Sequence, residues 1–155
     1  MLLISIFAQV REEEADMVAH HAGLGVGVTM NLRSARIRWS RGENSIPREL
    51  LPPTDFPYDK LSGPEADISE VEKARLREAV RYMSSVASSH LAYTRAKQTL
   101  VPSQARACLL PVIPAMHFLS VLQVAQYEIF DPRLSESNNL KVLLLMGRAW
   151  LTGIF

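Results

Sequence analysis

The feature that most constrains the fold is a long stripe of apolar residues in the second half of the chain. Ser69 and Glu72 form the S-x-x-E pattern of a capping box, which marks the start of a helix. The apolar residues that follow recur every three or four positions, so they share one helix face; they are Leu76, Val80, Met83, Ala87 and Leu91. This spacing predicts one long amphipathic helix from Ser69 to about Leu100.

The N-terminal part of the chain also has helical spacing. Apolar residues recur between Met1 and about His21, opposite an acidic block, which predicts an amphipathic helix. A second segment continues to Arg33 and contains three glycines at alternate positions. A G-x-G-x-G pattern without a preceding strand is a weak phosphate-loop signal, so close helix packing is the preferred interpretation of these glycines.

A long stretch between these helical parts lacks apolar periodicity. Residues 36–47 are polar and basic and predict an irregular loop, followed by a short helix from Pro47 through Leu51. The prolines and the glycine after Leu51 predict a surface connection. We therefore expect helices over residues 1–35, an irregular connection over 36–68 and C-terminal helices over 69–155, within one partial domain.

The C-terminal part predicts two further helical regions. Pro102 opens the first, Pro111 and Pro114 kink or split it, and its apolar face continues toward Phe130. A final helix is expected from about Leu140 to Leu151. Because no segment shows the alternation of a strand, the predicted fold class is all-α.

Composition excludes several classes of partner and site. The 17 basic and 16 acidic residues leave a net charge of +1, so no global field attracts nucleic acid or an anionic membrane. The single cysteine, Cys108, excludes an internal disulfide and indicates a buried thiol. The apolar run from Val142 to Met146 is far shorter than the ~20 residues that span a bilayer. The start of the chain lacks the basic region of a targeting peptide.

The histidines do not predict a catalytic or metal site. His20 and His21 are adjacent, so on a helix they point about 100° apart and cannot chelate one ion together. His90 and His117 lie on apolar stretches, where a histidine commonly makes one local hydrogen bond in a core. No nucleophile elbow is present, so hydrolase chemistry has no support.

Residues 29–47 resemble a segment of the squalene and phytoene synthases, T-N-I-L-R-D-V-x-E-D-x-x-R-G-R-x-Y-L-P, without a gap. The preceding run Ala19 to Gly23 is similar to the family's A-x-H-x-G pattern. Segments from His90 to Leu134 resemble the last family helices. The matched positions of the central segment are Thr29, Leu32, Arg33, Arg41, Gly42 and Pro47.

This resemblance implies an all-α fold, the C-terminal half of an isoprenoid-synthase-like helical bundle. It is strongest to the family branch that contains a mitochondrial complex I assembly factor. Only the second half of a typical member is covered, so the helices with the first aspartate-rich motif are absent. The chain alone would leave an apolar face exposed, which implies an obligate protein partner: a separate N-terminal half or a large mitochondrial complex.

The resemblance also implies that the metal site is lost. Family enzymes hold magnesium between two aspartate-rich motifs because departure of a diphosphate needs concentrated positive charge. In this sequence Met30, Ser34, Ile37 and Arg38 stand at the asparagine and acidic positions of the second motif. The nearby arginines would repel a cation and could instead contact an anion or a lipid headgroup; they are Arg33, Arg36, Arg38 and Arg41.

The predicted function is therefore that of a pseudoenzyme without a cofactor, metal or catalytic residue. The first hypothesis is a subunit or assembly factor of a mitochondrial respiratory complex, foremost complex I, on the matrix side of the inner membrane. The alternative is a lipid- or isoprenoid-binding module that uses the residual apolar cavity and the basic residues. An active prenyl transferase would require a partner chain to supply every metal ligand. No nucleic-acid partner is indicated.

Overall fold

The computed structural model describes residues 13–51, 68–134 and 139–152. Within these ranges the chain contains helices and no strand, which confirms the all-α prediction. Residues 1–12 of the helix predicted from Met1 to about His21, and most of the proline-rich connection, lie outside the described residues. Residues 13–21 of that helix form the start of α2. The α-helices are α2 (Glu13–Trp39), α3 (Glu70–Lys97), α4 (Val112–Val124) and α5 (Asn139–Thr152), and the 3-10 helices are η1 (Arg48–Leu50), η3 (Gln98–Leu100), η4 (Arg106–Leu109) and η5 (Pro132–Leu134).

Helix α2 is one continuous helix that runs through the glycine-containing segment. The prediction of an irregular loop from residue 36 is wrong for its first residues, because the helix continues to Trp39. It ends in a Schellman motif, in which the amides of Gly42 and Glu43 donate to the carbonyls of Trp39 and Arg38, both at 2.9 Å. Gly42 has a φ of +74°, a conformation that favours glycine at this position.

Helix α3 begins at the predicted capping box. The Ser69 amide donates to the Glu72 carboxylate at 2.6 Å, and the Glu72 amide donates to the Ser69 hydroxyl at 3.3 Å. Two otherwise unpaired donors of the first turn are thereby satisfied. All five apolar residues of the predicted stripe are buried, which confirms that they form the core face of this helix.

The first C-terminal helical region differs from prediction at both ends. No helix opens at Pro102, because residues 103–105 form turns and the next element is the 3-10 helix η4, Arg106–Leu109. Pro111 precedes α4, and Pro114 lies in its first turn, where the missing amide costs little. Helix α4 ends at Val124 and does not reach Phe130, because Gln126 and Tyr127 adopt positive φ values of 52° and 61° that end the helix. The final helix, α5, has the predicted position.

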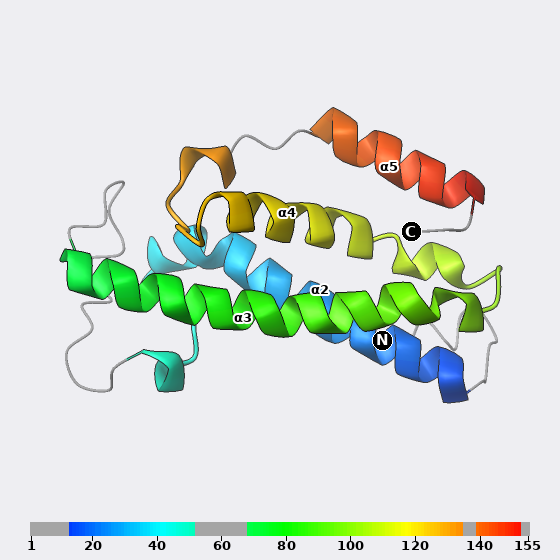
Figure 1. Ribbon diagram of the computed structural model, residues 1–155, viewed down its shortest axis with the longest axis horizontal. Coiled ribbons are helices and arrows are strands. Elements are labelled where there is room, and N and C mark those ends of the chain that lie inside the picture. The colour runs from blue at the N-terminus through cyan, green and yellow to red at the C-terminus, as the bar shows by residue number, and fades with distance from the viewer. Residues whose placement is uncertain (1–12, 52–67, 135–138, 153–155) are drawn as a thin grey trace.

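The four α-helices of the described residues run alternately in opposite directions (Figure 1). Helices α2 and α3 pack against each other and make the most extensive contact. Helix α4 packs on both of them, and α5 lies on the outside against α4. One apolar core joins α2, α3 and α4. By length and composition alone, Arg106–Val124 is the one segment of the described ranges that could cross a membrane, a criterion that core helices also meet.

Candidate functional site

The outer face of α2 carries the positions that the family resemblance assigns to the second metal-binding motif. Met30 and Ile37 lie two turns apart on this face and are 54% and 58% exposed. Ser34 lies between them, and its hydroxyl donates to the Asn31 carbonyl at 3.2 Å. Arg38 is exposed at the edge. The face is therefore a solvent-accessible apolar patch with a cationic margin.

This face does not fit a magnesium ion. It presents a thioether at Met30, an alkyl chain at Ile37, a guanidinium at Arg38 and, at Ser34, a hydroxyl already bonded within the helix. Hard divalent cations bind anionic or carbonyl oxygen ligands, and none of these four side chains supplies one. In the part of the chain that the structure describes, no group of three or more histidine, cysteine or acidic residues is placed to hold a metal ion.

The four arginines of the predicted anion contact do not meet at one point. Arg33 and Arg38 are exposed and lie about 140° apart around α2, at 100° per residue. The guanidinium of Arg36 lies over the Phe130 ring, 6.0 Å from its centroid. Arg41 follows the helix in the turn. Anion binding by these residues stays a prediction, and the geometry favours two separate cationic edges over one pocket.

A cluster of rings joins α2 to α3, and the sequence showed no sign of it. The Nδ1 atoms of His21 and His90 lie 2.9 Å apart, at hydrogen-bond distance. The His21 ring also stacks on Tyr93, with centroids 4.1 Å apart and planes inclined by 27°. The expected partner of His90 was a local one, whereas the structure pairs it with a residue 69 positions away. One imidazole must donate while the other accepts, so the contact requires at least one neutral ring.

The surroundings of His21 disfavour its charged form. Desolvation, followed by repulsion from His90 and His20, lowers the pKa of His21 below the ordinary value of 6.5. The unfolded chain then binds more protons than the folded chain as the pH falls through 6.5. The stability that neutral His21 contributes is complete above this pH and is lost as the pH falls toward its folded pKa.

We therefore expect the wild-type chain to unfold at a lower urea concentration at about pH 5.5 than at about pH 7.5. Substitution His21→Gln should reduce this difference, because it removes the shifted group. The measurement is urea unfolding followed by circular dichroism at both pH values. Substitution His117→Gln, in α4 and outside the cluster, is the control and should leave the difference intact. Equal differences for wild type and His21→Gln would exclude this role of His21.

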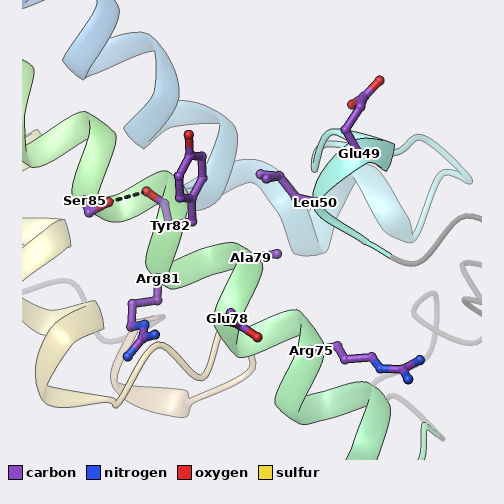
Figure 2. A pocket seen from close by; sticks show the side chains of 8 residues that line it. All are labelled: Glu49, Leu50, Arg75, Glu78, Ala79, Arg81, Tyr82 and Ser85. Carbon is purple, nitrogen blue, oxygen red and sulfur yellow. Dashed lines mark hydrogen bonds between the residues drawn. The ribbon is translucent and has the colours of Figure 1, made fainter.

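A shallow pocket of about 760 Å³ lies between η1 and α3 (Figure 2). Its two acidic and two basic side chains balance in charge, and the charged ends of Glu49, Arg75 and Arg81 point in different directions. The Ser85 hydroxyl is engaged with the Tyr82 carbonyl at 2.7 Å. The side chains that line this pocket do not converge on one point at which a substrate atom could react. The lining residues are Glu49, Leu50, Arg75, Glu78, Ala79, Arg81, Tyr82 and Ser85.

Cys108 also lacks the setting of a nucleophile. Its thiol is free and half-buried in η4, not fully buried as predicted.

Together, the antiparallel helices and the α2 face define a class of protein: an all-α bundle whose candidate site lacks hard-metal ligands and exposes an apolar surface.

The comparison with known proteins identifies the family. The chain belongs to the squalene/phytoene synthase family, which matches residues 1–140. The "NADH dehydrogenase (ubiquinone) complex I, assembly factor 6" of Rattus norvegicus is 26% identical over 141 residues, covering 91% of this chain and 40% of that protein. The proteins of the same name from Mus musculus and Homo sapiens show the same identity and coverage. No solved structure gives a significant match.

The family match confirms the resemblance inferred from residues 29–47. The chain spans about 40% of the length of the curated relatives that it matches. The rest of their length has no counterpart in this sequence.

Proposed function

We propose that this chain is a catalytically inactive family member that acts as a subunit or assembly factor of a mitochondrial respiratory complex. Complex I is the first candidate host, and the matrix side of the inner membrane is the proposed location. The observation that carries the proposal is the outer face of α2, where Met30, Ser34, Ile37 and Arg38 supply no ligand for a hard cation. Without such a cation, departure of a diphosphate lacks its main electrostatic support.

The same face supports a role in protein binding. Met30 and Ile37 expose large apolar side chains two turns apart on this face. Exposed apolar surface of this kind is normally covered in a working assembly. Arg33 and Arg38 flank the apolar centre on opposite sides. A complementary partner would present an apolar centre with carboxylates at its margins. The names of the relatives support complex I components as that partner.

The proposal is tested by native-gel fractionation of mitochondria from cells that express the tagged full chain, followed by mass spectrometry. Comigration with a mature respiratory complex would indicate a subunit, and comigration only with its subcomplexes would indicate an assembly factor. Migration of the chain alone would contradict the proposal.

Substitution Ile37→Glu tests the α2 face in the same experiment. It places a charge in the centre of the proposed interface and should release most of the chain from the large assembly. Val71→Glu on α3 is the matched control, since Val71 is also β-branched and 62% exposed. If both variants, shown to be folded by circular dichroism, comigrate like wild type, the α2 face is not the interface.

A further inference from the structure

Helix α5 exposes most of its apolar side chains. Leu140, Leu144 and Leu151 lie within about 40° of one another around the helix and are between 66% and 85% exposed. Leu143 and Trp150 extend this surface on one side and are 63% and 65% exposed. We call these five residues the outer face of α5. Helix α5 packs on α4 (Figure 1). Ala149, about 160° around the helix from the middle of the outer face, is buried.

One edge of the outer face is cationic. Lys141 and Arg148 are two turns apart on the same side of α5, about 20° from each other around the axis, and both line a groove of about 460 Å³ between α4 and α5. Arg95 of α3 adds a third cation to the groove, and Ile113, Met116 and Leu145 add apolar walls. No acidic residue occurs in Asn139–Thr152. The chain as a whole is nearly neutral, so this region is locally polarised.

We propose that the outer face of α5 docks onto an anionic phospholipid surface. A helix with exposed leucines, a tryptophan and flanking basic residues has the composition of a helix that lies in a membrane interface. The leucines would enter the acyl boundary while Lys141 and Arg148 meet the phosphates. The inference rests on the proposed function for its location, the matrix side of the inner membrane, and names the surface that contacts the lipid.

The positive charge of α5 favours an anionic phospholipid surface over a second copy of the chain as the partner of its outer face. Two-fold pairing of α5 with itself would bring Lys141 of one copy toward Arg148 of the other. Within Asn139–Thr152 neither helix carries a carboxylate that could accept the Arg148 guanidinium of the other copy. Anionic headgroups provide that compensation at every point of the surface.

The test is flotation of the purified full chain with two kinds of vesicle, phosphatidylcholine alone and phosphatidylcholine mixed with phosphatidylglycerol. We expect binding to the mixed vesicles that weakens with added salt, and weaker binding to the neutral ones. The double substitution Lys141→Gln/Arg148→Gln should lower partitioning onto the mixed vesicles roughly 25-fold and affect the neutral vesicles little.

The apolar contribution is tested by Leu144→Glu, which should lower partitioning onto both kinds of vesicle by about 10-fold or more. Val71→Glu, an exposed apolar residue of α3, is the control for added charge and should change neither. The proposal is overturned if wild type does not float or if Val71→Glu weakens binding as much as Leu144→Glu. It is also overturned if Lys141→Gln/Arg148→Gln keeps full binding to the mixed vesicles.

The vesicle test of lipid binding and the native-gel test of the proposed function can fail independently. If wild type fails to bind vesicles but Leu144→Glu releases the chain from the large assembly on a native gel, the outer face of α5 is a protein interface. The lipid proposal then fails while the proposed function stands. If the chain floats as expected but migrates alone in mitochondria, the assembly role fails and the lipid surface remains.

Discussion

Substitution Trp39→Ala is expected to lower the free energy of unfolding by about 3–5 kcal/mol, the usual cost of removing a large aromatic side chain from a core. Trp39 is the last residue of α2 and is only 2% exposed. Its ring packs on Phe130, with centroids 5.7 Å apart, in the segment that follows α4. Loss of the indole therefore removes one contact that joins the end of α2 to Phe130, another being the Arg36 guanidinium over the same ring.

The measurement is urea unfolding of the full chain followed by circular dichroism at neutral pH. Trp39→Phe keeps an aromatic ring and should cost much less than Trp39→Ala. Trp150→Ala in α5 is the matched control, because the same atoms are removed from a side chain that is largely exposed. It should change stability by no more than about 0.5 kcal/mol. Equal losses at both tryptophans would show that Trp39 does not fill a core site.

Substitution Gly25→Val should destabilise the chain by about 3 kcal/mol, at the upper end of overpacking effects. A Cβ atom at Gly25 would lie 2.6 Å from Leu91 Cδ2, 2.7 Å from Leu91 Cγ and 3.1 Å from the Ala87 carbonyl oxygen. The Leu91 side chain would have to move, and the backbone at Ala87 limits how far α2 can retreat. Helices α2 and α3 would have to separate around Gly25.

Gly27→Val provides the control two residues away in the same helix. A Cβ atom at Gly27 meets nothing within 4 Å, and valine is no worse than glycine as a helix former. This variant should unfold within about 0.5 kcal/mol of wild type. A second test is the double variant Gly25→Val/Leu91→Ala, which should be more stable than the sum of the two single changes implies. Strict additivity would mean that these two side chains do not compete for space.

Local sequence signals were sufficient for α3. The Ser69–Glu72 capping box and the apolar stripe lie within one helix, so both can be recognised without knowledge of other segments. The interpretation of the glycines as packing residues is confirmed at Gly25. The sequence was divided into two helical segments at about His21, whereas packing on α3 keeps α2 continuous through the glycines despite their low helix propensity.

Contacts between distant segments could not be predicted in the same way. The His21–His90 hydrogen bond depends on the register of two antiparallel helices, which neither local sequence specifies. For the α2 face, the family resemblance supplied the motif positions Met30, Ser34, Ile37 and Arg38. The basic residues from 36 onward were predicted to form a loop, because few of them are apolar. Only the structure shows that Arg33 and Arg38 occupy separate edges of a helix.

The peripheral place of α5 has a consequence for the way in which the chain can change shape. Because this helix packs chiefly on α4, its detachment opens one interface and leaves the crossing of α2 and α3 intact. Local opening of this kind requires less free energy than global unfolding, so we expect the last helix to open before the core of α2, α3 and α4. The chain can therefore rearrange its outermost layer on contact with a large assembly or surface while the core that positions α2 is preserved.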